Sequence, residues 1–309
     1  MMVAGKERRQ FAAEDLSEVH DTMSTYQILT DSCCDISDAE LATWQVRAAQ
    51  MQVLVEGEES RPNNAVDNAA FYEELRNGKN ASTAAVNVAA FHELFEPVLE
   101  EGRDILYLCF SAALSTGTYQ SANIAADDLR QKYPDRRLLV LDTRCASMGQ
   151  GLLVYLVTRF QQGGATLDEA YAFAEETAKK MCHWFIVDDL FFLKRGGRVS
   201  GVAALLGSAL GIKPVLHADD EGRLINVGKA RGRIGAIEAL VKKFGELVLP
   251  ENEVVFISHG DCEKDAQTLA ARLREEYGVE NIVIGKIGPV VGAHSGPGTL
   301  ALFFLGSAR

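Results

Sequence analysis

The sequence predicts an α/β protein built from two α/β domains with parallel-rich sheets. Two observations support this prediction: short apolar runs alternate with amphipathic stretches, and several of the apolar runs end in small polar residues. The chain has 309 residues, of which 47% are hydrophobic and 24% are charged, so it is long enough for two hydrophobic cores. Ligands of open α/β sheets bind at the carboxyl ends of strands, which makes these polar strand ends the first candidate site residues.

The first half of the chain contains three apolar runs with the length of buried strands. They cover residues 26–30, which lead into Asp31-Ser32, residues 105–110, which lead into Ser111, and residues 138–141. Apolar residues at helical spacing predict helices at 88–99, 150–160 and 168–181, and Thr166 is a candidate N-cap for the last of these.

The second half repeats the alternation. We expect strands at 184–187, 254–258 and 281–286, a helix at 263–277, and a closing apolar helix at 298–305. A boundary near residues 180–184 divides the chain into an N-terminal domain, 26–182, and a C-terminal domain, 183–309. Residues 1–25 are expected to form an N-terminal extension, since they are charged and lack the apolar stretch of a signal peptide.

Charge and cysteine content exclude several classes of protein. The net charge of −12 argues against nucleic-acid binding, and no apolar run reaches the roughly 18–20 residues that span a bilayer, so no integral membrane association is expected. The six cysteines form no C-x-x-C pair, which favours reduced thiols in a cytoplasmic protein. No metal or cofactor is expected, because metal-ligand clusters and nucleotide-binding loops are missing from the sequence.

Three loops of small residues are the main candidates for a binding site. They cover residues 80–87, 110–120 and 287–298, and they contain hydroxyl groups, helix starts and one imidazole, His294. Hydroxyls and backbone amides of this kind can together bind one anion. For each loop alone the alternative is purely structural, because Ser and Thr are ordinary turn and cap residues.

Two basic clusters stand out in an acidic chain. One contains Lys194, Arg195 and Arg198 and follows the acidic pair Asp188-Asp189; the other, at residues 229–233, contains Arg231. They either form ion pairs with that acidic pair or bind a phosphate or an acidic partner, because guanidinium groups hold phosphoryl oxygens with two parallel hydrogen bonds.

The order of these motifs resembles the DegV family of fatty-acid-binding proteins, whose kinase-coupled members are called FakB. Thr30-Asp31-Ser32 is similar to the family's T-D-S strand end, residues 114–122 to its L-S-G-T-Y-Q-S-A loop, residues 193–198 to its L-K-R-G-G-R segment, and residues 287–298 to its closing motif. The resemblance extends from about residue 26 to residue 306.

The resemblance implies a carrier protein, without an enzymatic activity of its own, that holds one long-chain fatty acid in a buried tunnel between two α/β domains. A separate fatty acid kinase would convert the presented carboxylate to an acyl phosphate. The residues implied for the carboxylate are Ser82, Thr83, Ser111, Ser115 and His294, and those implied for the kinase or phosphate are Arg198 and Arg231. The sequence departs from the family pattern at Ala84, Ala85 and Ala112, where hydroxyl or amide side chains are usual.

Two other functions remain open from the sequence alone. A stand-alone serine-dependent acyl hydrolase would use Ser115 or Ser295 with His294, although the G-x-S-x-G elbow is missing. A ligand-sensing regulator is the other alternative, although no helix-turn-helix pattern supports contact with DNA.

Overall fold

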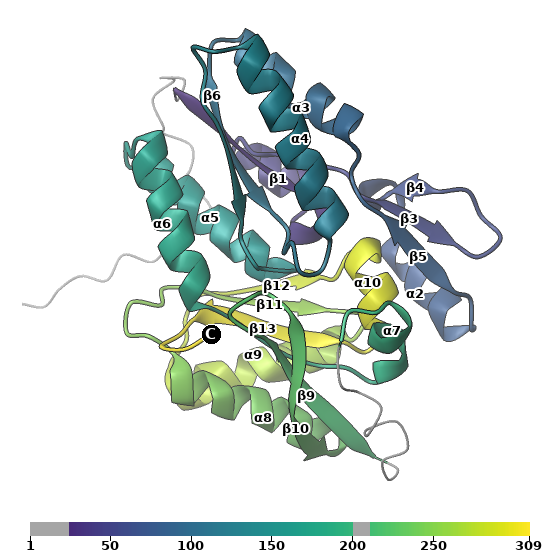
Figure 1. Ribbon diagram of the computed structural model, residues 1–309. Coiled ribbons are helices and arrows are strands. Elements are labelled where there is room, and N and C mark those ends of the chain that lie inside the picture. Colours follow the sequence, from purple (N-terminus) through teal and green to yellow (C-terminus); the bar gives the residue numbers. More distant parts are fainter. Residues whose placement is uncertain (1–24, 200–210) are drawn as a thin grey trace, which may run out of the picture.

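The computed structural model describes residues 25–199 and 211–309, and it arranges them in two lobes (Figure 1). The upper lobe in the figure contains a four-stranded sheet, and the lower lobe contains a six-stranded sheet. A small three-stranded sheet lies to one side. The extension predicted at residues 1–25 falls outside the described residues except for Thr25.

The elements follow the predicted alternation. The strands are β1 (Tyr26–Asp31), β2 (Arg47–Ala49), β3 (Gln52–Val55), β4 (Arg61–Pro62), β5 (Ala81–Ala84), β6 (Asp104–Cys109), β7 (Leu138–Asp142), β8 (Met181–Ile186), β9 (Ile212–Ala218), β10 (Leu224–Arg231), β11 (Val255–His259), β12 (Ile282–Lys286) and β13 (Leu300–Leu305). The helices are η2 (Ser32–Cys34), α1 (Asp38–Thr43), η3 (Asn63–Ala65), α2 (Asn68–Arg76), α3 (Val88–Glu100), α4 (Thr116–Lys132), α5 (Met148–Gln162), α6 (Leu167–Lys180), α7 (Leu190–Arg195), α8 (Gly232–Leu247), α9 (Glu263–Tyr277) and α10 (Pro289–Ser295).

The upper sheet confirms the parallel prediction. Its strand order is β2-β1-β6-β7, and every neighbouring pair is parallel. Ile105 and Tyr107 of β6 pack with α3 and α4, whereas Leu106 and Leu108 point to the other face, towards α5. Both faces of this sheet are therefore covered by helices, as a parallel sheet requires.

For the lower sheet the parallel prediction is wrong. The strand order is β10-β9-β8-β13-β11-β12, and β11–β12 is its one parallel pair. The strands β8, β9 and β10 follow one another along the chain and lie side by side as antiparallel neighbours, so this part of the sheet is not built from the βαβ units that make strands parallel. The lower sheet begins with β8 at Met181, so the predicted division at residues 182/183 falls inside a strand and stays a prediction.

The predicted closing helix is wrong, because residues 300–305 form the strand β13. This strand lies between β8 and β11 in the middle of the lower sheet. Leu300, Leu302 and Phe304 pack against α8 and α9, while Ala301 and Phe303 face the other lobe. Because both faces are buried, the run is apolar throughout, and a continuous apolar run of this length has no periodicity that distinguishes a strand from a helix.

Helix α5 joins the two lobes into one core. Its buried face, which includes Leu152 and Leu153, belongs to a cluster that also contains Ile28 of the upper sheet and Phe256 and Phe303 of the lower sheet. The N-cap predicted at Thr166 is confirmed at the start of the following helix, α6, where Thr166 also forms a capping box with Glu169. The lobes are therefore packed against each other without an intervening linker.

The short helix α10 belongs to the last part of the chain, but side chains of the upper lobe hold its start. The Asp35 carboxylate accepts a hydrogen bond from the Gly288 N–H at 2.9 Å, and the Asn63 side-chain oxygen accepts one from the Val290 N–H, also at 2.9 Å. The buried Tyr72 hydroxyl donates to the Ile287 carbonyl at 3.0 Å. These three contacts satisfy backbone groups at the helix start that have no partner within the helix.

Asp35 is itself held in an unusual environment. Burial raises the pKa of its carboxyl group to about 7, although hydrogen bonds from the Ser147 hydroxyl, at 2.5 Å, and from the Gly288 N–H act in the opposite direction. Ser147 also contacts the Ser258 hydroxyl at 2.9 Å, so the network spans both lobes.

We predict that Asp35→Asn removes one component of the pH dependence of stability. Because the pKa of Asp35 is raised from 3.8 to about 7, the folded protein retains a proton there that the unfolded chain releases. The stabilisation from this group is complete below pH 3.8 and is lost as the pH rises through about 7, with a slope of at most about 1.4 kcal/mol per pH unit. Urea unfolding between pH 5 and pH 8 should show a flatter profile for the variant. The exposed Asp135→Asn serves as the control, and an unchanged profile for Asp35→Asn would contradict the prediction.

Candidate functional site

A cavity lies between the two lobes, and we call it the central cavity. Its wall is mainly apolar, and the apolar residues come from both halves of the chain: Met51, Phe110, Leu114, Ala146, Phe185, Leu193, Leu224, Ile287, Val290, Val291, Ala301 and Phe303. Its polar residues are Thr83, Ser115, Ser147, His183, Arg198, His294, Ser295 and Thr299. The apolar lining is typical of sites that bury a hydrophobic ligand.

A second, outer pocket adjoins one end of the central cavity. It is lined by Leu54, Glu56, Asn80, Ala81, Ser82, Thr83, Arg195, Gly196, Arg198, Ala293 and His294. Thr83, Arg198 and His294 line both spaces, and we call these three residues the junction. A ligand in the central cavity can therefore reach the outer pocket past the three polar side chains of the junction.

Thr83 and His294 contact each other at the junction. The Thr83 hydroxyl and His294 Nε2 are 2.8 Å apart, and they bring together β5 of the upper lobe and α10. Successive side chains of a strand point to opposite faces. Thr83 therefore reaches the central cavity, whereas its neighbour Ser82 is exposed and lines only the outer pocket.

The imidazole of His294 is neutral at pH 7. Burial lowers its pKa to about 4, and the positive charges of Arg198 and Arg195 act in the same direction. A side chain on Gly196 would overlap the His294 ring, so the glycine of the basic turn allows the close approach of α7 and α10. His294 therefore acts as a hydrogen-bonding group, and the positive charge of the junction comes from Arg198.

The structure places the two predicted serines of the loop after β6 differently. Ser115 lines the central cavity, and its hydroxyl lies 2.9 Å from the Thr118 hydroxyl. Ser111 lies outside the cavity wall, is 1% exposed and donates to the Gly222 carbonyl at 3.0 Å. In this structure Ser111 therefore hydrogen-bonds to the turn between β9 and β10.

The predicted arginines also lie in different places. Arg198 follows α7 at the junction, where its Nε donates to the Leu114 carbonyl at 3.3 Å and its Nη1 to the Gly196 carbonyl. Arg231 is exposed at the start of α8 and lines neither the central cavity nor the outer pocket. Within the described residues, Arg231 makes no ion pair or side-chain hydrogen bond.

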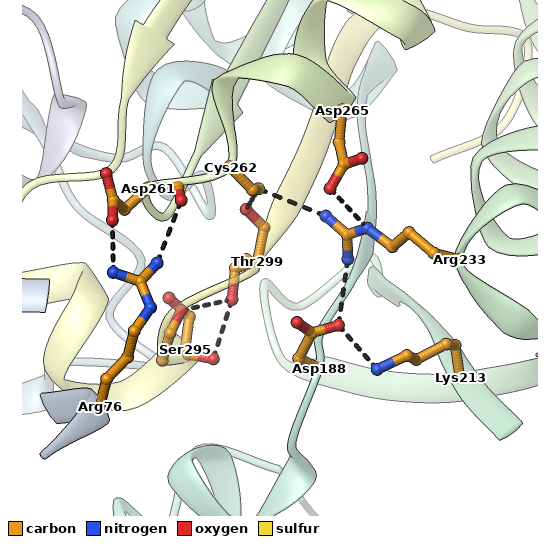
Figure 2. Close-up of polar contacts among 10 residues, drawn as sticks. Arg76, Asp188, Lys213, Arg233, Asp261, Cys262, Asp265, Ser295 and Thr299 are labelled. Carbon is orange, nitrogen blue, oxygen red and sulfur yellow. Dashed lines mark hydrogen bonds and ion pairs between the residues drawn. The ribbon is translucent and has the colours of Figure 1, made fainter. Parts of the chain in front are cut away.

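The ion-pair alternative is wrong for the first basic cluster, which the acidic pair does not neutralise, but it holds for Arg233 of the second cluster, which pairs with Asp188. Figure 2 shows Asp188 between Lys213, at 2.7 Å, and Arg233, at 3.4 Å. Asp189 instead caps α7 by accepting the Phe191 N–H. In the same view Arg233 also contacts Asp265 and Cys262. Arg195 and Arg198 are consequently left facing the outer pocket.

Sequence reasoning missed most of the cavity wall, because these residues are scattered and apolar. It also missed His183, whose Nε2 accepts the Ala146 N–H at 3.1 Å, so its Nδ1 donates to the Met181 carbonyl at 2.9 Å. Burial lowers the pKa of His183 to about 3. This second imidazole in the wall is therefore uncharged and has a partner at each nitrogen.

Asp31 of the T-D-S strand end supports a loop of the cavity wall without lining the cavity. Its fully buried carboxylate accepts hydrogen bonds from the Phe110 N–H at 2.8 Å and from the Tyr107 hydroxyl at 3.0 Å. Burial raises its pKa. Phe110 lines the cavity, so Asp31 positions the loop that carries Phe110 and Ser115 and does not touch the cavity itself.

Several other features can be stated for residues 25–199 and 211–309. No three His, Cys, Asp or Glu side chains in these ranges cluster so that they could hold a metal ion. None of the helices there combines the length and the apolar character that crossing a bilayer requires. All six cysteines of the chain are free.

The arrangement suits an amphiphile with one anionic end. The apolar wall can take a hydrocarbon chain, and the junction offers a hydroxyl, a neutral imidazole and one guanidinium. It does not suit a serine nucleophile activated by His294, since His294 contacts Thr83 and the Ser115 hydroxyl contacts Thr118. With a pKa of about 4 and two arginines beside it, His294 is also a weak general base.

Comparison with known proteins agrees with the fold. The model of the DegV family, described as uncharacterised proteins, matches residues 25–307. The chain belongs to the DegV family. A DegV domain-containing protein of Clostridium perfringens is 43% identical over 290 residues, which cover 93% of this chain and 99% of that protein.

Solved DegV structures share the fold over nearly the whole chain. A DegV lipid-binding protein from Thermotoga maritima has a TM-score of 0.79 and 30% identity, covering 92% of this chain and 99% of that one. A DegV-family protein from Thermus thermophilus, described by its fatty acid binding, has a TM-score of 0.81 and 28% identity, covering 91% and 99%. The two-lobed DegV architecture expected from the sequence is thereby confirmed.

We predict that His294 titrates far below an ordinary histidine. In the unliganded protein the imidazole should show a midpoint near pH 4 rather than 6.5, because burial and the two nearby arginines disfavour the imidazolium. Arg198→Gln should raise the midpoint, since it removes one of the positive charges. The measurement is an NMR titration of the His294 ring. A midpoint near 6.5, or no rise in the variant, would contradict the electrostatics described above.

Proposed function

We propose that this protein binds one long-chain fatty acid, with the alkyl chain in the central cavity and the carboxylate at the junction. The observation that carries the proposal is the apolar cavity between the lobes, which ends at Thr83, His294 and Arg198. The relatives from Thermotoga maritima and Thermus thermophilus, described as lipid binding and fatty acid binding, support the same ligand class.

The two ends of such a ligand contribute differently to binding. Burying each methylene contributes about 0.8 kcal/mol, so a chain of about sixteen carbons contributes roughly 10 kcal/mol before the ordering costs. A carboxylate taken out of water destabilises the complex unless it is hydrogen-bonded and its charge is compensated. The apolar wall therefore supplies the affinity, and the junction orients the acid group.

We assign the carboxylate to Thr83, His294 and, from the same cavity wall, Ser115. Ser82 lies one step further out in the outer pocket, where it would contact the head group only if the carboxylate projects from the cavity. Ser111 is engaged with Gly222 and supports the loop rather than the ligand. Ala84, Ala85 and Ala112 lack the hydroxyl and amide groups of the family pattern, which leaves Thr83, Ser115 and His294 as the proposed neutral donors.

We further propose that the carboxylate is presented to a fatty acid kinase in the cytoplasm. The kinase would transfer the terminal phosphoryl group of a nucleoside triphosphate to a carboxylate oxygen, forming an acyl phosphate and releasing the nucleoside diphosphate. Two features of this chain support the proposal: the carboxylate site opens to the outer pocket, and Arg195 and Arg198 line that pocket without carboxylate partners in the described residues. Arg231 is exposed and also has no carboxylate partner in these residues.

We predict that protein purified from cells releases long-chain fatty acid on extraction with organic solvent, as identified by mass spectrometry. His294→Ala should weaken palmitate binding by about 10- to 100-fold, because it removes a hydrogen bond to a charged group. Thr83→Val should weaken it by a smaller factor in the same range. Binding can be measured by calorimetry with delipidated protein.

The matched control is Ser82→Ala, on the same strand but on the opposite face from Thr83, which should leave palmitate binding within about twofold of the wild type. Protein that neither carries a fatty acid nor takes up added palmitate or oleate would refute the proposed ligand. Turnover of a chromogenic acyl ester would instead favour the hydrolase alternative.

We predict that Arg231→Ala leaves fatty acid binding unchanged and slows phosphorylation of the bound fatty acid by the kinase. Arg231 lies outside the central cavity, so it tests the kinase contact without disturbing the ligand. A substitution of Arg198 cannot distinguish fatty acid binding from kinase contact, because Arg198 lines the junction and would affect both. The assay compares the rate of acyl-phosphate formation at saturating palmitate for the wild type, Arg231→Ala and Arg231→Lys. Equal rates for all three proteins would show that Arg231 does not contribute to the contact with the kinase.

A further inference from the structure

Strand β12 is the last strand of the lower sheet, so one of its two edges has no neighbouring strand among the described residues (Figure 1). Two backbone hydrogen bonds show how its other edge is paired. The Val255 N–H donates to the Asn281 carbonyl, and the Ile287 N–H donates to the His259 carbonyl, both at 2.9 Å. In a parallel pair such bonds come from every second residue of a strand. The odd-numbered residues from 281 to 287 therefore face β11.

The even-numbered residues Ile282, Ile284 and Lys286 direct their backbone N–H and C=O groups to the outer edge. None of these groups has a hydrogen-bond partner in residues 25–199 and 211–309. The next outward amide, that of Gly288, confirms the direction, because it donates to Asp35 of the upper lobe. An unpaired strand edge of this kind is a template for a further strand.

Space is left open beside this edge. A pocket is lined on one side by residues 283–286 and on the other by residues of α1 and η3 of the upper lobe. The strand contains no proline, and its pairing with β11 has no register shift, so two common features that discourage edge pairing are missing. By contrast, β10 at the opposite end of the same sheet has a register shift between Asn226 and Gly228.

The side chains of β12 add an apolar component on both faces of the sheet. Ile282 and Ile284 pack against the cluster that contains α8 and α9, and Val283 packs against the cluster around α5. All three side chains are only partly buried. Three consecutive β-branched residues without a charge between them favour pairing with another strand.

The sequence around this edge is self-complementary in the antiparallel direction. Outward groups meet outward groups when a twofold axis passes beside Val283, because Ile282 then lies opposite Ile284 of the second copy. The same register places Glu280 opposite Lys286, and both residues are exposed. A twofold axis beside Ile284 would instead place Lys286 opposite Ile282, without a counter-charge. Opposite charges across paired strands stabilise the pairing, and the symmetry provides this contact twice.

We propose that the outer edge of β12 is the interface of a homodimer, in which the β12 strands of two copies pair antiparallel and join the two lower sheets into one. The partner is a second copy of this chain, and each copy supplies the same outward groups. The inference is independent of the proposed ligand, because residues 280–286 do not line the central cavity.

The first test measures the molar mass of the purified full-length protein by sedimentation equilibrium at increasing protein concentration. The wild type should approach twice the mass of one chain. Glu280→Lys and Lys286→Glu should each weaken dimerisation by about tenfold, because two attractive contacts become repulsive. The control is Asp135→Lys, which changes an exposed charge of the upper lobe and should dimerise like the wild type.

The two charge variants also test the register. An equimolar mixture of Glu280→Lys and Lys286→Glu should form a heterodimer about as readily as the wild type dimerises, because each copy then offers the charge that the other lacks. The double variant with both substitutions should dimerise like the wild type for the same reason. Failure of both combinations to restore the dimer overturns the proposed register and with it the interface.

Ile284→Pro removes an outward N–H without removing a hydrogen bond to β11, so it should weaken dimerisation by at least about tenfold. Its thermal stability shows whether the fold is intact, and if this variant unfolds, the charge variants still decide. A wild type that remains monomeric up to about 1 mM overturns the inference. A dimer that the charge variants leave unchanged also overturns it, because another surface would then form the interface.

Discussion

The position of α10 is the constraint on which the site depends. This helix carries His294 and Ser295, comes from the last part of the chain, and is held at its start by Asp35 and Asn63 of the upper lobe. Its N-terminal amides would be unsatisfied without these side chains, and Gly292 lets it approach Tyr72 closely. The cavity therefore exists only when the two lobes are packed together, because each lobe supplies part of its wall and part of the support for α10.

The charge distribution around the cavity follows from the same packing. The imidazoles in the wall, His183 and His294, are neutral because burial penalises their charged forms. The carboxyl groups nearest the loops, Asp31 and Asp35, have raised pKa values for the same reason and bind backbone amides rather than ligand. Fixed positive charge is found at the junction and outside it, on Arg198 and Arg195. The interior of the cavity thus favours an uncharged hydrocarbon chain, and the junction favours an anionic group.

Much of this architecture follows from local sequence signals. The amphipathic helices at 88–99 and 263–277 and the strands at 26–30 and 138–141 have clear periodicity or length, and Thr166 caps a helix as its sequence context predicts. The closing segment was assigned wrongly, because β13 is apolar on both faces. The antiparallel order of the lower sheet was missed for a related reason: pairing depends on which strand inserts between β8 and β11, and no local pattern encodes that choice.

The sequence by itself determined the family, the hydroxyl-rich loops and the candidate residues Thr83, Ser115 and His294, because short motifs with fixed spacing carry that information. Only the tertiary structure decided which of these groups share a space. It separated Ser82 from Thr83 by the alternation of β5, moved Ser111 to the turn at Gly222, paired Asp188 with Lys213 and Arg233, and left the Ser295 hydroxyl unpartnered. The physical reason is that hydrogen bonding and burial are set by contacts between distant segments, which form only when both lobes close on α10.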